Sequence, residues 1–183
     1  TTDKYEKWGV RKFKISGIDI EIRGVCKGAG MIEPNMATML AFIFVDIKMT
    51  KKIISKILHN CAAESFNKIS VDGDMSTNDS VALVATGLNS IDLTNKKHYQ
   101  HVEQNIKSVF RQLAHMIVSD GEGATKVCKL SVTKAYSFIQ ANQVCYSIAN
   151  SNLFKTALFG EDPNWGRIIA RLGSLNKIRY NSN

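Results

Sequence analysis

The chain has little proline and few cysteines, and neither forms a recognisable pattern. Scarce proline excludes a collagen-like or proline-rich disordered chain. No two cysteines have the spacing of zinc ligands and no secretory segment accompanies them, so we predict reduced thiols and no metal site. The residues concerned, in a chain of 183, are Pro34, Pro163, Cys26, Cys61, Cys128 and Cys145.

The chain also lacks a long apolar segment. No apolar run approaches the length needed to span a bilayer, so we predict no membrane partner. The net charge is +8, and such a balance can indicate nucleic-acid binding. However, the lysines are scattered among asparagines and isoleucines without an aromatic-lined basic stripe. This pattern favours a solvated surface, and we predict no nucleic-acid partner. The reduced thiols predicted above indicate an intracellular protein, and we predict a cytoplasmic location.

The length is sufficient for a single domain with a sizeable core. The first residue is Thr1 rather than methionine, and residues 1–3 already belong to one of the sequence motifs described below. We therefore interpret the chain as a piece of a longer polypeptide that lacks both ends.

Hydrophobic periodicity predicts a chain with both strands and helices. Alternation of apolar and polar residues predicts two strands joined by a turn within 11–26. A continuous apolar run predicts a buried core strand at 39–47, and short strands are predicted at 66–73 and 127–132. Apolar residues at helical spacing predict helices at 50–66, 97–119 and 138–150. A further helix is predicted at 165–172, a short helix or turn at 153–159, and a helix that ends at Gly87 in the apolar segment 80–87.

One stretch, residues 27–45, organises the rest of the sequence. It begins with a glycine-rich loop that contains Pro34 and continues into an apolar run from Met39. Thr38 lies at the joint, where a β-branched side chain has little rotamer freedom and its hydroxyl is held in place. A threonine hydroxyl becomes a good nucleophile when the amine of a chain N-terminus serves as its base. For Thr38 this requires cleavage of the Ala37–Thr38 bond; the alternative is an ordinary threonine at the start of a strand.

Five ordered blocks of the sequence resemble the ornithine acetyltransferase (glutamate N-acetyltransferase) family. The first is the run KGAGMIEPNMATMLAF at 27–42, which resembles the self-cleavage segment of that family. The others are TTD at 1–3, SFN through GD to STND within 65–79, GEGATK at 121–126 and ALFGEDPNWGR at 157–167.

The resemblance implies an α+β fold, a layered sandwich of β-sheets covered by helices, with a self-processed threonine nucleophile. It implies one partial domain over 1–183, in which 1–37 end an α chain and 38–183 begin a β chain. The two chains of one precursor are expected to form a heterotetramer. Asn78 and Asp79 are expected to hold neighbouring loops, and the 157–167 block to lie near the cleft.

The implied reaction moves an acetyl group from N2-acetylornithine to glutamate in arginine biosynthesis, without a cofactor; some members of the family also accept acetyl-CoA. Thr38 carries the acetyl group. Thr1, Lys27 and Glu122 contact substrate, with Lys27 on a carboxylate and Glu122 on an amine. The family's oxyanion hole, a Thr-Gly pair, and its C-terminal substrate contacts lie outside this sequence, so the isolated piece is expected to be inactive.

Two alternatives remain open from the residues alone. One keeps the self-processed threonine but transfers the acyl group to water, which gives an amidohydrolase or aminopeptidase. The other is an uncleaved, non-catalytic remnant that acts as a scaffold. The four histidines have no evident catalytic partner in the pattern.

Overall fold

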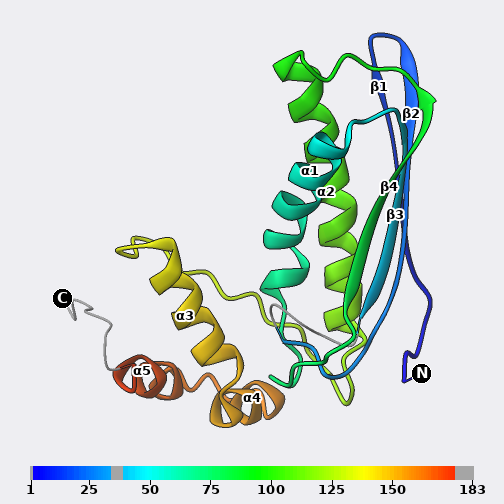
Figure 1. Ribbon diagram of the computed structural model, residues 1–183. Coiled ribbons are helices and arrows are strands. Elements are labelled where there is room, and N and C mark those ends of the chain that lie inside the picture. The colour runs from blue at the N-terminus through cyan, green and yellow to red at the C-terminus, as the bar shows by residue number, and fades with distance from the viewer. Residues whose placement is uncertain (1, 34–38, 176–183) are drawn as a thin grey trace. The chain divides into compact units, whose positions relative to one another are not determined.

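The computed structural model describes residues 2–33 and 39–175. These residues divide into two compact units, Thr1–Gly123 and Ala124–Asn183. The first contains a four-stranded sheet with two long helices, and the second is helical (Figure 1). Among the described residues, no helix is both long enough and apolar enough to cross a membrane.

The sheet of the first unit has the strand order β1-β2-β3-β4. β1 (Lys7–Ile15) and β2 (Ile18–Lys27) form an antiparallel hairpin, and β3 (Leu40–Ile47) pairs antiparallel with β2. β4 (Ser80–Asn89) lies parallel to β3 at the edge. The predicted hairpin and core strand are therefore confirmed.

The hairpin turns at Ser16 and Gly17, which both have positive φ, 50° and 83°. This conformation matches the twist of a two-residue hairpin and is easily adopted by glycine. The turn fixes the register, in which Lys7 pairs with Cys26. The hairpin thus returns the chain to the level of Lys7 just before the glycine-rich loop begins.

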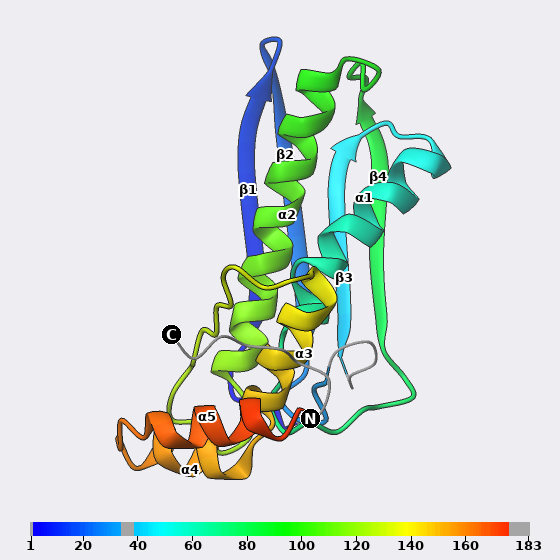
Figure 2. The ribbon, with the colours of Figure 1, turned by 90° about the vertical axis from the view of Figure 1, so that its left-hand side faces the viewer.

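Two helices cover one face of the sheet (Figures 1 and 2). They are α1 (Lys51–Ala63), whose N-cap Thr50 accepts a hydrogen bond from the Ile53 amide, and α2 (Lys96–Ser119), capped by Asn95. A short 3-10 turn, η1 (Phe66–Lys68), follows α1. The helices predicted at 50–66 and 97–119 are confirmed, with ends that differ by a few residues.

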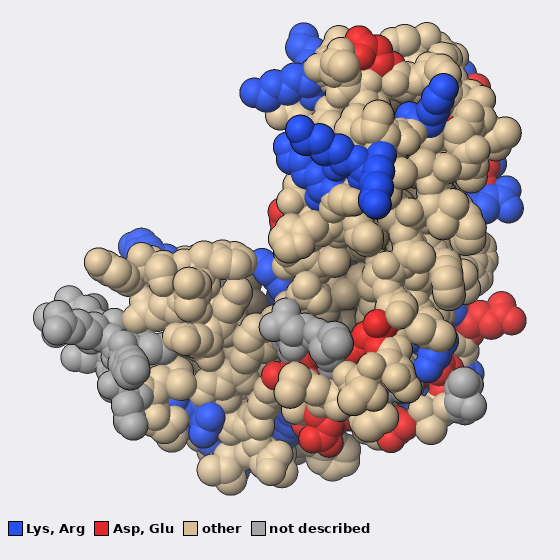
Figure 3. Space-filling view, viewed as in Figure 1, with Lys and Arg blue, Asp and Glu red and all other residues tan. Residues whose placement is uncertain are grey.

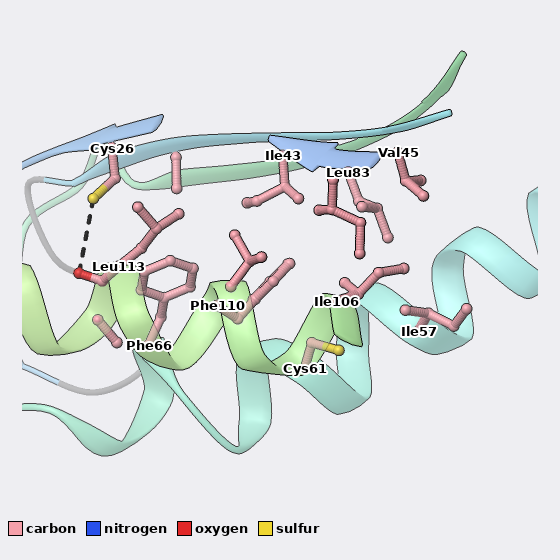
Figure 4. Close-up of a cluster of buried hydrophobic side chains, with 14 of the residues drawn as sticks. Cys26, Ile43, Val45, Ile57, Cys61, Phe66, Leu83, Ile106, Phe110 and Leu113 are labelled. Atoms are coloured by element: carbon pink, nitrogen blue, oxygen red, sulfur yellow. Dashed lines mark hydrogen bonds between the residues drawn. The ribbon is translucent and has the colours of Figure 1, made fainter. Parts of the chain in front are cut away.

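The core lies between this face and the two helices, as Figure 4 shows. Inward residues of β2 and β3 alternate along each strand, as a sheet with one covered face requires. The cluster is aliphatic, with one tilted pair of aromatic rings, Phe66 and Phe110. Cys26 also lies in it, and its thiol donates to the carbonyl oxygen of Leu113 on α2 at 3.8 Å.

Among the described residues of the first unit, no helix covers the outer face of the sheet, although this face is partly apolar. Six large apolar side chains on outward positions of the strands remain 37–59% exposed: Trp8, Val10, Val25, Phe42, Phe44 and Val84. The strand register aligns them in two rows across the sheet, Trp8–Val25–Phe42–Ala82 and Val10–Arg23–Phe44–Val84. This surface, the outer face, differs sharply from the closed inner one.

The second unit contains α3 (Phe138–Ala149), α4 (Asn152–Phe159) and α5 (Trp165–Gly173). The helices predicted at 138–150 and 165–172 are confirmed, and the segment 153–159, predicted as a short helix or turn, is a helix. Arg167 joins two of them, because its guanidinium donates to the backbone carbonyl of Leu153 and, at 2.8 Å, to the hydroxyl of Thr156. Lys126 forms an ion pair of 3.0 Å with Glu161.

Three predicted elements are wrong. Residues 80–87, predicted as helix, form most of strand β4, where they pair with β3. Residues 66–73, predicted as a strand, begin with η1 and continue as a loop. Residues 127–132, predicted as a strand, have no regular secondary structure and no strand partner among the described residues.

Candidate active site at one end of the sheet

Strand pairing places one predicted site residue, Lys27, at one end of the sheet. Lys27, the last residue of β2, pairs with Leu40, the first of β3, and Leu40 pairs with Ser80, the first of β4. β1 starts at this same end, since Lys7 pairs with Cys26. We call it the Lys27 end of the sheet; α2 also reaches it, at Ser119.

A glycine loop, residues 28–33, leaves β2 at the Lys27 end. Its backbone is held by carboxylates from two other segments. Gly28, at φ 141°, donates its amide to Asp3 Oδ1 at 2.8 Å. The amides of Met31 and Ile32 donate to the two oxygens of Asp72, at 2.6 and 3.0 Å. The loop therefore has a defined conformation before any ligand binds.

Glu122 lies against this loop. Its amide donates to the carbonyl of Ala29 at 2.9 Å. A Cβ placed on Gly30 would come within 2.9 Å of the Glu122 carboxyl carbon, so the glycine is needed for this approach. The structure thus brings the loop that follows Lys27 together with Glu122, although the two residues are far apart in sequence.

A buried charge cluster fixes the segments on either side of the loop. The ammonium of Lys7 donates to a carboxylate oxygen of Asp3 and, at 2.5 Å, to Oδ2 of Asp120. The side chains of Lys7 and Asp120 are both 0% exposed. Asp120 Oδ2 also accepts the Lys4 amide at 3.0 Å. The cluster links the N-terminal segment, the glycine loop and the end of α2.

Electrostatics within the cluster favour its ionised form. Burial raises the pKa of Asp120, but hydrogen bonds from Lys7 and from the Lys4 amide outweigh it, and the pKa is lowered overall. The pKa of Asp3 is lowered in the same way, by Gly28 and Lys7 against burial. Burial lowers the pKa of Lys7, but the two carboxylates outweigh this effect, and the pKa is raised overall. All three groups are therefore charged at neutral pH.

Asp79 contacts the first described residue after the predicted cleavage point. Its Oδ1 accepts the amide of Met39 at 2.8 Å. Burial raises the pKa of Asp79, an effect that the Met39 amide and the nearby charge of Lys27 partly offset. The expectation that Asp79 holds a neighbouring segment is confirmed. Within the described part of the chain, Asn78 forms hydrogen bonds with Ser76 and Thr77, which belong to its own loop.

Three predicted site residues, Thr1, Ala37 and Thr38, lie outside the described residues. Lys27 and Glu122 lie within them and are connected through the glycine loop, as described above. Sequence reasoning did not identify Asp3, Lys7, Asp72 and Asp120 as organisers of the site. Only Asp120 carried a possible signal, because a carboxylate at a helix C-terminus is unfavourable unless a cation compensates it.

Charge is unevenly distributed over the first unit. Figure 3 shows basic side chains gathered over the N-terminal ends of α1 and α2, where both helices begin with lysines. The Lys27 end, in contrast, gathers the carboxylates of Asp3, Asp72, Asp79, Asp120 and Glu122. Such an end can hold an amine, while Lys27 can hold a carboxylate.

The fold and the candidate site define an α+β protein in which several loops place charged side chains at one end of a helix-covered sheet. The chain belongs to the ArgJ family, whose model matches residues 1–182. This finding confirms the resemblance on which the predicted site residues depend.

Curated relatives have the same family name. The chain is 45% identical over 178 residues to a mitochondrial arginine biosynthesis bifunctional protein ArgJ from Meyerozyma guilliermondii, covering 94% of this chain and 41% of that protein. It is 45% identical to the mitochondrial ArgJ protein of Dictyostelium discoideum, covering 94% of this chain and 40% of that one. The ArgJ protein of Gluconobacter oxydans is 42% identical, with 94% and 42% covered. The chain thus spans about two fifths of the length of these relatives.

A solved structure supports the fold. The crystal structure of the arginine biosynthesis bifunctional protein ArgJ from Bacillus halodurans matches with a TM-score of 0.70 and 36% identity, over 79% of this chain and 68% of that one. The predicted α+β class is therefore confirmed. The predicted cytoplasmic location is not, because two of the relatives named above are mitochondrial proteins.

Proposed function

We propose that the full-length polypeptide that carries this chain transfers an acetyl group from N2-acetylornithine to glutamate, in arginine biosynthesis. The acetyl group passes through an ester on Thr38, after self-cleavage at Ala37–Thr38. Membership of the ArgJ family supports the pathway, and the names of the relatives describe arginine biosynthesis proteins.

The observation that carries the proposal is the pairing of Lys27 with Leu40. Leu40 is two residues after Thr38 in sequence, so Lys27 lies beside the start of the strand that follows the proposed nucleophile in the chain. The carbonyl of Ala29, two residues beyond Lys27, accepts a hydrogen bond from the Glu122 amide. N2-acetylornithine carries one carboxylate and one free amine, which matches one lysine and one glutamate on connected segments.

The chemistry begins with attack of the Thr38 hydroxyl on the carbonyl of Ala37. The peptide nitrogen leaves as the new α-amine of Thr38, and water hydrolyses the resulting ester. In the transfer reaction this amine takes the hydroxyl proton as Thr38 attacks the acetyl carbonyl, then gives it to the departing ornithine nitrogen. The amine of glutamate attacks the acetyl ester in turn and regenerates Thr38.

Lys27 holds the α-carboxylate of the donor or acceptor, and Glu122 and Thr1 complete the substrate contacts. Stabilisation of the tetrahedral intermediate requires an oxyanion hole. The residues that the resemblance assigns to it are not in this sequence, so the chain by itself is inactive. The two chains produced by cleavage associate as a heterotetramer, and acetyl-CoA is an additional donor to be tested.

Intact mass spectrometry of the full-length polypeptide tests the first step. Wild-type protein should give two fragments, one of which begins Thr-Met-Leu-Ala by Edman degradation. Thr38→Ala should give one uncut chain, whereas the control Thr94→Ala, at an exposed threonine beyond the other end of the sheet, should cleave normally. An uncut wild-type protein would contradict self-processing and favour a non-catalytic remnant.

A product assay tests the second step. Cleaved enzyme is incubated with acetylornithine in the presence and absence of glutamate, and separately with acetyl-CoA and glutamate. Formation of acetylglutamate from acetylornithine and glutamate, with little free acetate when glutamate is absent, supports transfer. Free acetate formed at the same rate without glutamate would instead identify a threonine amidohydrolase.

A further inference from the structure

Asp79 and Ser80 bind the two backbone polar groups of Met39, its amide and its carbonyl. The carboxylate Oδ1 of Asp79 accepts the Met39 amide at 2.8 Å, and the amide of Ser80 donates to the Met39 carbonyl at 3.1 Å. The ladder between β3 and β4 begins one residue later, with the pair Leu40–Ser80. The side chain of Asp79 therefore supplies an acceptor for the backbone amide just before the ladder begins at Leu40.

The second oxygen of this carboxylate has a different environment. Asp79 Oδ2 is buried and has no hydrogen-bond partner among the described residues. A buried, unpaired carboxylate oxygen costs free energy, so the contact of Oδ1 with Met39 is maintained against a penalty. A carboxylate retained under such conditions is a candidate for a functional role, because a smaller residue would avoid the cost.

We propose that Asp79 is a positioning residue for self-processing at Ala37–Thr38. A peptide unit is planar, so a group that fixes one amide N–H also limits the orientations open to the α-carbon of the preceding residue. For the amide of Met39 that residue is Thr38, whose hydroxyl must meet the carbonyl of Ala37. The proposal rests on the proposed function, and it assigns to Asp79 the geometry of the nucleophile and no proton transfer.

Three substitutions separate position from charge. Asp79→Asn keeps an oxygen acceptor in place and removes the charge, Asp79→Glu keeps the charge and moves the acceptor, and Asp79→Ala removes both. In the full-length polypeptide, the rate of self-cleavage followed by intact mass should fall about tenfold or more for Asp79→Glu and Asp79→Ala. For Asp79→Asn it should stay within about threefold of wild type.

Asp46→Ala is the matched control. Asp46 lies on the same strand and its Oδ1 accepts a backbone amide, that of Glu21, at 3.0 Å, but near the opposite end of β3. This variant should cleave within about twofold of wild type. It corrects for a general loss of strand order, together with the thermal midpoint of each variant.

Kinetics of the matured enzyme give a readout that a purely structural role would not move. Cleaved Asp79→Glu, isolated after long incubation, should show a reduced kcat with an unchanged KM for acetylornithine, because Asp79 positions the nucleophile and does not hold substrate. A raised KM with normal kcat would overturn the assignment.

The outcomes separate this inference from the proposed function. Wild-type protein that is never cut contradicts both. If wild-type protein is cleaved, and Asp79→Glu and Asp79→Ala are cleaved as fast as wild type, only the role of Asp79 is contradicted. Asp79→Asn as slow as Asp79→Ala would show that the charge matters instead of the acceptor position. If Asp79→Ala gives no folded protein, the comparison of Asp79→Asn with Asp79→Glu still decides.

Discussion

Lys7 is an unusual residue, because its ammonium is completely buried. The group is stabilised by Asp3 and Asp120, and their hydrogen bonds connect three segments of the chain. The cluster carries one positive and two negative charges, and Oδ1 of Asp120 has no partner among the described residues. Removing the cation therefore leaves two carboxylates close together at a buried position.

Lys7→Met should destabilise the protein strongly. Breaking a buried ion pair by removing one partner costs about 3–5 kcal/mol, because the remaining charge is uncompensated. Chemical denaturation measures this directly. Lys14→Met is the control, since Lys14 pairs with Asp19 at 3.3 Å on the surface and an exposed pair contributes less than about 1 kcal/mol. Equal effects of the two substitutions would contradict the role of the cluster.

The cluster also predicts how stability depends on pH. The carboxylates of Asp3 and Asp120 have a lowered pKa, so their contribution is present above the usual value of 3.8 and is lost as the pH falls through the folded-state values. Lys7 has a raised pKa, so its contribution is complete below 10.5 and is lost as the pH rises past the folded-state value.

The measurement compares wild type with a triple variant, Asp3→Asn, Lys7→Met and Asp120→Asn. Their difference in unfolding free energy should be constant between about pH 5 and 10 and should change on either side. A difference that varies across neutral pH would show that other groups control the titration.

The cysteines should differ in reactivity. Burial raises the pKa of Cys26 and of Cys61 to about 12, so little thiolate is available. Cys128 is exposed. At pH 8, iodoacetamide should therefore modify Cys128 first, and Cys26 and Cys61 only after denaturation, as peptide mass mapping would show. Early labelling of Cys61 would mean that α1 opens readily.

At the scale of the element, the long periodic helices were predictable and the short apolar segments were not. α2 has seven buried residues on one face, at helical spacing. Ser80–Asn89 is a short apolar run, which periodicity cannot assign to strand or helix. The parallel partner β3 decides the matter, and it lies about 40 residues earlier in the chain. The predicted strand at 127–132 failed for the opposite reason, because the described residues offer it no partner.

Close contact between α2 and the sheet depends on Gly24 in β2. A Cβ there would lie 2.8 Å from a methyl of Leu113 and 2.9 Å from one of Val109. Gly24→Val should therefore force the helix outward and destabilise the protein by about 1–3 kcal/mol. Ala82→Val adds bulk on the outer face and should change stability by less than about 0.5 kcal/mol. Denaturant midpoints test both, and a neutral Gly24→Val would contradict tight packing here.

At the scale of the whole molecule, the sequence indicated which blocks form the site but not what holds them together. Lys27 and Glu122 were identified through the family resemblance. The connection between them depends on the Glu122 amide and on Asp3, Lys7 and Asp120. Lys7 and Asp120 are 113 positions apart, and no local pattern reveals such a pair. Long-range ion pairs of this kind need the fold before they can be inferred.

The outer face has a consequence for handling the chain by itself. Trp8, Phe42 and Phe44 are exposed to water on this sheet surface, and such an apolar surface favours association with other apolar surfaces. The isolated chain should therefore self-associate and bind the dye ANS, as light scattering and fluorescence would show. Replacing Phe42 and Phe44 by lysine should suppress both signals without unfolding the core. A wild-type chain that neither self-associates nor binds ANS would show that the outer face is covered.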